Sequence, residues 1–145
     1  MPAQKFDVVI IGAGIAGSAL AVALAGQGLS LALVEAQSLE RKPLPDDTSL
    51  KTFDARVSAL TPNSVRFLEQ LGAWSHIAGY RHCPYGHMTV WDAEGTGRIE
   101  FDCAELKAPA LGYIVENRAI VDGLLLAMDQ AHGIQRYNPD RLQSC

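Results

Sequence analysis

Three glycines and a later glutamate have the residue types and the spacing to hold a nucleotide. Gly12, Gly14 and Gly17 form a G-x-G-x-x-G pattern, and Glu35 follows 23 residues after the first of them. In such a pattern the first glycine allows a sharp turn, the second has no Cβ to block a phosphate, and the third allows close helix packing. N–H groups at a helix start bind phosphate, and a carboxylate accepts hydrogen bonds from ribose hydroxyls. We therefore predict an adenine-dinucleotide site.

The carboxylate of Glu35 would repel a 2′-phosphate, which favours FAD or NAD over NADP at this site. The residues between the glycines complete the predicted contact set. They are Ala13, Ile15 and Ala16. The glycine pattern permits both FAD and NAD.

These residues need a strand, a helix and a second strand to position them. The apolar run Val8–Ile11 leads directly into the glycines, Leu20, Ala23 and Leu24 follow at helical spacing, and Leu29–Val34 forms a second apolar run. We predict a Rossmann-like β-α-β unit over residues 1–35, in an α/β fold with a parallel sheet.

The composition fits one globular domain. The 145 residues are 48% hydrophobic and 19% charged, with a formal net charge of −4. The charge gives no indication of nucleic-acid binding. Because no apolar run approaches the roughly 18 residues of a spanning helix, we expect no transmembrane segment. Asp7 interrupts the apolar start, which favours a strand over a signal peptide.

The cysteines indicate a reducing compartment. Cys83, Cys103 and Cys145 are odd in number and far apart, so we expect a cytoplasmic protein without structural disulfides. Peripheral contact with a membrane stays open.

A polar, proline-containing loop is predicted over residues 36–57, and Arg56 lies near its end. An arginine entering a short apolar run could bring its guanidinium to a diphosphate or a ribose. The alternative is a solvated arginine or one paired with Asp54. The next helix should start at Thr61 as N-cap and end at Gly72.

The second half of the chain alternates strands and a helix. We predict a loop over residues 79–86, a β-hairpin over 86–102 and a helix over 117–131 with Asn117 as its N-cap. A further strand should follow Gly133. The loop histidines and Cys83 are too few for a zinc site, and we predict no metal.

Several segments resemble one family, the flavin-dependent aromatic hydroxylases of ubiquinone biosynthesis within the p-hydroxybenzoate hydroxylase class. Besides the dinucleotide unit, they are residues 54–60 (DARVSAL), 71–74 (LGAW), 83–85 (CPY), 90–92 (VWD), 99–107 (IEFDCAELK) and 111–117 (LGYIVEN). The resemblance covers essentially the whole chain.

The resemblance implies FAD rather than NAD, places Arg56 beside the FAD diphosphate, and makes Asn117 a polar contact to the cofactor. It implies that NADH or NADPH donates electrons, and that molecular oxygen hydroxylates a polyprenylated phenol or benzoquinol. It assigns the hairpin to the sheet of the substrate domain. A multiprotein quinone-biosynthesis complex and a position at the inner membrane stay open. No catalytic acid or base can be assigned.

The family also has two later flavin motifs, a D-G pair and a G-D segment, which this chain lacks. We therefore expect an N-terminal, truncated part of a hydroxylase, with uncovered apolar faces and no activity by itself. Two alternatives are an NAD-binding dehydrogenase or reductase and a non-catalytic flavin-binding or assembly module.

Overall fold

The computed structural model describes residues 4–45 and 49–143, and its first three elements form the expected β-α-β unit. Strand β1 (Val8–Ile11) passes through helix α1 (Ile15–Leu24) to strand β2 (Leu31–Val34). The two strands are parallel, with Val8 opposite Leu31. Strand β8 (Ile134–Tyr137) adds to β2, also in parallel, so the sheet order is β1-β2-β8. The predicted α/β fold with a parallel sheet is confirmed.

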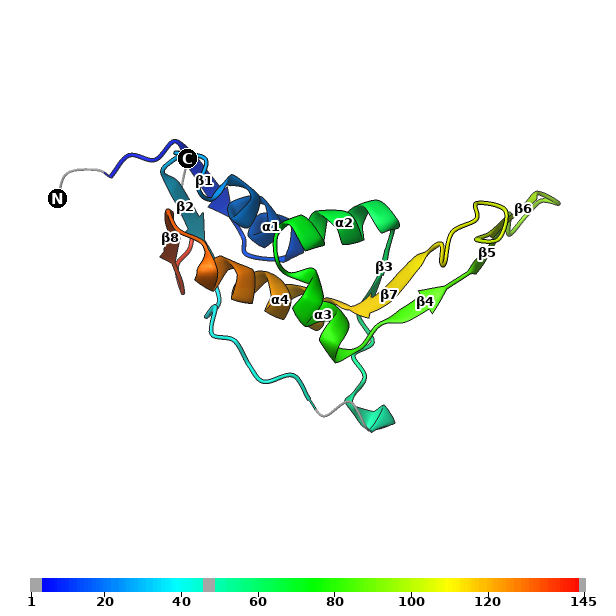
Figure 1. Cartoon of the computed structure of the whole chain (residues 1–145). Helices are drawn as coiled ribbons and strands as arrows, with labels where there is room; N and C mark the ends of the chain where they lie inside the picture. The colour runs from blue at the N-terminus through cyan, green and yellow to red at the C-terminus, as the bar shows by residue number, and fades with distance from the viewer. Residues whose placement is uncertain (1–3, 46–48, 144–145) are drawn as a thin grey trace.

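Helices cover one face of this sheet. Helix α4 (Asn117–Gln130) packs along α1, and both lie against the sheet (Figure 1). Ile10, Leu33 and Met128 meet in the core between them. Because side chains of a strand alternate between faces, Val9 and Ile11 point the other way, and they are 52% and 53% exposed. The far face of β1 is open.

A second, antiparallel sheet follows at the other end of α4. Its order is β3 (Val57–Leu60), β7 (Gly112–Glu116) and β4 (Cys83–Tyr85). Strand β4 corrects the sequence-based expectation of a loop over 79–86. Its residues pair with β7, a long-range contact that a segment containing Pro84 does not reveal locally.

Two short helices pack beside α4 and lead from β3 to β4. Helix α2 (Pro62–Gln70) starts as expected, since the Thr61 side chain accepts a hydrogen bond from the Ser64 amide. Helix α3 (Trp74–Tyr80) lies against α4. Between β2 and β3 the chain forms one 3₁₀ turn, η1 (Leu50–Thr52), within the segment predicted as loop.

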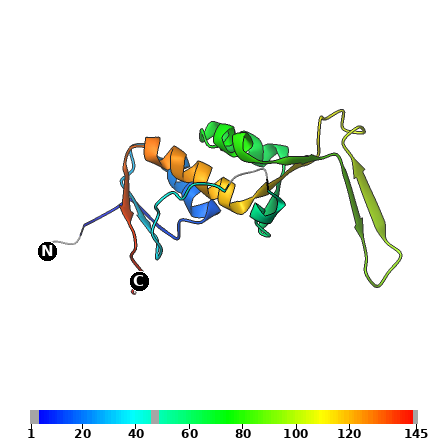
Figure 2. The same cartoon turned by 90° about the horizontal axis from the view of Figure 1, so that it is seen from below.

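The hairpin of β5 (His87–Trp91) and β6 (Arg98–Asp102) projects away from the rest of the molecule (Figure 2). Met88 pairs with Phe101, and Val90 with Ile99. These four side chains are 41% to 60% exposed. Together with the open face of β1, they bear out the expectation of uncovered apolar surface.

Within the described parts of the chain, none of the helices is both long and apolar enough to cross a lipid bilayer.

Candidate nucleotide-binding site

The glycine turn between β1 and α1 has the geometry that each glycine was expected to provide. Gly12 has φ +94°, a conformation that other residues rarely adopt. A Cβ on Gly17 would lie 1.9 Å from the Gly12 carbonyl oxygen, so the helix packs directly on the turn. A Cβ on Gly14 would meet no atom within 4 Å. The backbone at Gly14 is therefore open to a ligand.

Glu35, directly after β2, fastens this turn. Its Oε2 accepts a hydrogen bond from the Ala13 amide at 2.7 Å, and its Oε1 accepts one from the Gln37 amide at 2.9 Å. These backbone hydrogen bonds, that from Ala13 first, hold the pKa of the Glu35 carboxyl below its usual value, against the opposing effect of burial. A carboxylate has further lone pairs, so the same oxygens can still accept from ribose hydroxyls.

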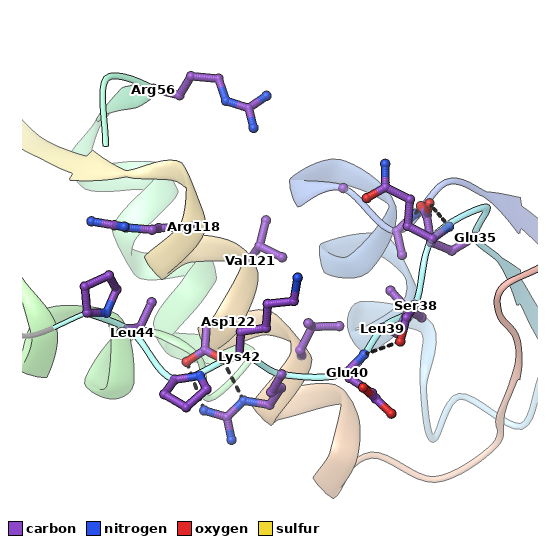
Figure 3. A pocket seen from close by; sticks show the side chains of 17 residues that line it. Glu35, Ser38, Leu39, Glu40, Lys42, Leu44, Arg56, Arg118, Val121 and Asp122 are labelled. Carbon is purple, nitrogen blue, oxygen red and sulfur yellow. Dashed lines mark hydrogen bonds and ion pairs between the residues drawn. The ribbon is translucent and has the colours of Figure 1, made fainter. Parts of the chain in front are cut away.

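A hollow of about 630 Å³ lies beside the turn (Figure 3). One wall is the glycine turn with Glu35, and a second is the strap, by which we mean residues 36–45. The third wall comes from Arg56 and the first two turns of α4. The lining residues from this helix and the turn are Ala13, Gly14, Arg118, Val121, Asp122 and Leu125.

Arg56, which the sequence analysis predicted beside a diphosphate, lines the hollow. Its side chain is exposed and extends into the open side of the hollow (Figure 3). Asp54 accepts from the Arg56 amide at 3.0 Å, and no ion pair of the guanidinium occurs among the described residues. The alternative of a side-chain pair with Asp54 is therefore wrong. The guanidinium is available to an anion.

Asn117 corrects part of the sequence-based expectation. The residue in the N-cap position of α4 is Glu116, whose backbone is extended, and Asn117 is the first helical residue. The Asn117 Oδ1 accepts from the Ser58 hydroxyl at 2.6 Å, and its amide donates to the Arg56 carbonyl at 3.0 Å. The first of these bonds occupies the side-chain oxygen that an N-cap uses as acceptor. Asn117 does not line the hollow.

Arg118, which the sequence reasoning missed, does line it. Its side chain stands at the start of α4, and its Nε donates to Glu116 Oε2 at 2.7 Å. One feature of the sequence could have predicted Arg118 as a site residue. It is a basic residue in the first turn of a helix, where the helix dipole disfavours a cation. A cation at that position suggests an anionic partner.

The strap is attached to the helices by one buried carboxylate. Asp122 is 7% exposed, and its two carboxylate oxygens accept hydrogen bonds from Nε and Nη2 of Arg41 at 2.8 and 2.9 Å. Its Oδ2 lies 2.5 Å from His76 Nε2. Burial raises the pKa of Asp122, but the hydrogen bonds from Arg41 and His76 outweigh it and hold the pKa below its usual value. The strap wall is therefore fixed to α4 and, through His76, to α3.

The structure thus brings part of the predicted set together. Ala13, Gly14, Glu35 and Arg56 line one hollow. Gly12, Ile15, Ala16 and Gly17 build the turn and the helix start behind it. In the described ranges, no group of three or more histidine, cysteine, aspartate or glutamate side chains is arranged to hold a metal ion. The arrangement fits an adenine dinucleotide, with an open backbone for phosphates, two guanidiniums and a carboxylate for the ribose.

A family model described as FAD dependent oxidoreductase matches residues 7–42, which contain β1, the glycine turn, α1, β2 and part of the strap. This match supports FAD as the dinucleotide.

Two curated relatives match most of the chain. It is 36% identical over 129 residues to 3-demethoxyubiquinol 3-hydroxylase of Escherichia coli (strain K12), covering 89% of this chain and 32% of the relative. It is 42% identical over 123 residues to a mitochondrial ubiquinone biosynthesis monooxygenase of Xenopus tropicalis, covering 82% of this chain and 25% of the relative. The chain therefore spans a third or less of the length of these relatives.

Solved structures share the fold. Pseudomonas aeruginosa PqsL in complex with 2-aminobenzoylacetate superposes with a TM-score of 0.64 at 20% identity, covering 92% of this chain and 33% of that one. A p-nitrophenol 4-monooxygenase of Pseudomonas putida DLL-E4 gives a TM-score of 0.58 at 14% identity, covering 88% of this chain and 30% of that one.

Proposed function

Since the chain is related to the flavin-dependent hydroxylases of ubiquinone biosynthesis, we propose that it carries the FAD-binding site of an aromatic-ring hydroxylase. The observation that supports this most directly is the open backbone at Gly14, next to a hollow of about 630 Å³ that Arg56 and Arg118 help to line. A diphosphate can approach the first turn of α1 there without meeting a side chain.

Each residue of the site has a proposed contact. Glu35 accepts hydrogen bonds from the adenosine ribose, and the amides from Gly14 to Gly17 face the diphosphate. Ala13, whose amide donates to Glu35, lines the hollow beside them. Arg56 and Arg118 neutralise the charge of the diphosphate from the opposite wall. Asn117 does not line this hollow, so its proposed contact is with a part of the cofactor that extends beyond it. The side-chain NH₂ group makes this contact, because Oδ1 accepts from Ser58 and the backbone amide donates to the Arg56 carbonyl.

FAD, when bound, supplies the redox chemistry, in which electrons from NADH or NADPH activate molecular oxygen for ring hydroxylation. The protein's own residues anchor and orient the cofactor. We propose a polyprenylated phenol or benzoquinol as substrate, in keeping with the demethoxyubiquinol named for the E. coli relative. A cytoplasmic location at the surface of the inner membrane and a quinone-biosynthesis complex are proposed on the same basis.

A second candidate is a non-catalytic flavin-binding or assembly module. The observation that favours it is the exposed apolar hairpin of β5 and β6, a surface suited to a partner protein. It predicts FAD binding and a stable complex, without oxidation of NAD(P)H in the presence of any phenol.

Titration of the purified chain with FAD, followed by flavin absorbance and fluorescence, tests the proposed site. We expect saturable binding by the natural chain and at least tenfold weaker binding by Gly14→Val, because the new side chain fills the phosphate approach. Gly79→Val is the matched control, since a Cβ there also meets nothing within 4 Å but lies in α3, away from the hollow. Binding of NAD without FAD would favour a dehydrogenase or reductase. Unchanged FAD binding by Gly14→Val would contradict the placement of the site.

A further inference from the structure

Glu116 is a buried carboxylate between two arginines. The residue is 3% exposed and ends strand β7. On one side Arg118 Nε donates to its Oε2 at 2.7 Å, and on the other Arg81 Nε lies 3.0 Å from its Oε1. The Asp54 amide donates to Oε2 at 3.1 Å. Burial of a carboxylate at such depth is costly unless it is paired and hydrogen-bonded in this way.

The two arginines also hold the chain just before Arg56. Both donate to the backbone carbonyl of Thr52, Arg81 from Nη2 at 3.3 Å and Arg118 from its own Nη2. The guanidinium of Arg81 lies 4.1 Å above the centre of the Phe53 ring. Residues 52–54 are therefore fixed from one centre, the carboxylate of Glu116.

Arg56 follows two residues later and is tied to the same frame. Its amide donates to Asp54, and its carbonyl accepts from the Asn117 amide, next to Glu116 in sequence. Arg56 and Arg118 carry like charges and line one hollow, so their presence on the same side of it depends on the backbones that hold them. Glu116 itself does not line that hollow, so it can act on a ligand there only through other residues.

We propose that Glu116 is a positioning residue of the dinucleotide site. Its carboxylate orients Arg118 directly and the 52–56 segment indirectly, so that both guanidiniums reach one diphosphate. The inference rests on the proposed function, because it takes the anion in the hollow to be the diphosphate of FAD.

Binding of ADP and of adenosine to the full chain tests this role, because the two probes differ only in the diphosphate. In Glu116→Gln the side chain has an NH₂ group in place of one carboxylate oxygen, so it cannot accept a hydrogen bond from one of the two arginines. We expect the Kd for ADP, from calorimetry, to rise about tenfold, and the Kd for adenosine, from NMR titration, to change less than twofold. Asp129→Asn is the matched control, because it removes an arginine pair on the same helix outside the hollow, and it should alter neither value.

A cycle with Arg118→Met separates positioning from general destabilisation. If Glu116 acts through Arg118, its substitution should weaken ADP binding much less in the Arg118→Met background. Equal losses for ADP and adenosine, tighter ADP binding by Glu116→Gln, or additive effects in the cycle would each overturn the role while leaving the proposed function intact. If the natural chain bound neither ADP nor FAD, the positioning role and the proposed function would both be overturned.

Should Glu116→Gln not fold, as judged by circular dichroism, Arg81→Lys gives a second test, because Arg81 contacts Glu116 and Thr52 but does not line the hollow. It keeps the charge but cannot bond Glu116 and Thr52 together as a guanidinium does. We expect ADP binding about tenfold weaker, and ADP binding equal to that of the natural chain would overturn the positioning role.

Discussion

Oε2 of Glu35 accepts a hydrogen bond of 2.7 Å from the amide nitrogen of Ala13. This bond joins the end of β2 to the turn that follows β1, and the Gly12 amide reinforces it by donating to the Val34 carbonyl at 2.8 Å. The acid proposed to hold the ribose is thus also the residue that fixes the phosphate turn. Ligand binding and the local stability of the turn should depend on the same carboxylate.

The stability contributed by Glu35 should depend on pH. Its folded-state pKa lies below the ordinary 4.5, so its contribution is fully present above the unfolded pKa and is lost as the pH falls through the folded pKa. We expect Glu35→Gln to lower the free energy of unfolding by about 1 kcal/mol at pH 7, a value discounted for partial exposure. Urea unfolding of both proteins at pH 7 and pH 3 should show the difference closing in acid.

Glu94→Gln is the control for this prediction, because Glu94 is an exposed residue in the hairpin turn. It should alter the unfolding free energy little at either pH. A difference between the natural chain and Glu35→Gln that is as large at pH 3 as at pH 7 would show that the carboxylate charge does not matter.

Two alanine substitutions in the glycine turn should separate folding from binding. Gly17→Ala places a Cβ 1.9 Å from a backbone oxygen, and we expect it to cost at least about 2 kcal/mol of unfolding free energy. Gly14→Ala meets no neighbouring atom, so it should leave thermal unfolding nearly unchanged while weakening FAD binding. Differential scanning calorimetry and FAD titration check the pair. Equal thermal stability of the two variants would be inconsistent with the close packing of α1 on the turn.

The local pattern of the sequence was sufficient to predict the elements around Gly12 to Glu35. Apolar runs, glycine spacing and the terminal acid all act within one β-α-β unit, so each constraint is visible in neighbouring residues. The start of α2 at Thr61 followed for the same reason, since a cap is a local interaction. The resemblance of later segments to the ubiquinone hydroxylases added the prediction that Arg56 lies beside the FAD diphosphate.

Long-range pairing explains what the sequence did not reveal. Strand β4 exists because Cys83 and Pro84 pair with β7. The side-chain oxygen of Asn117, expected to cap α4, instead accepts a hydrogen bond from Ser58, which is far away in sequence. Arg118 lines the hollow, and its guanidinium donates to the carbonyl of Thr52, a residue 66 positions away in sequence. Such partners cannot be deduced from spacing along one chain.

The pair of Arg41 and Asp122 should carry most of the attachment of the strap. Asp122→Asn is expected to lower the free energy of unfolding by about 2 kcal/mol, because it leaves Arg41 and His76 without their anion. In a double-mutant cycle with Arg41→Met, the loss of unfolding free energy in the double variant should be about 1 kcal/mol smaller than the sum of the two single losses. Chemical unfolding of the four proteins measures the coupling, and strictly additive losses would mean that the bidentate pair does not stabilise the fold.

The projecting hairpin gives the last prediction. Val90 and Ile99 form a cross-strand pair and are 50% and 60% exposed, so they contribute little to the core. We expect Val90→Thr/Ile99→Thr to leave the unfolding free energy within about 0.5 kcal/mol. Light scattering should show less self-association, because threonine keeps the strand preference but reduces the apolar patch.

Leu124→Ala provides the opposite control, since Leu124 is fully buried in α4, and it should cost about 2 to 5 kcal/mol. If the hairpin variant were destabilised to a similar degree, its apolar face would have to pack within the chain rather than outside it. If self-association were unchanged, the open face of β1, with Val9 and Ile11, would be the better candidate for the self-association surface. The expected pattern, normal stability with reduced association, would identify the hairpin as the surface through which the chain self-associates.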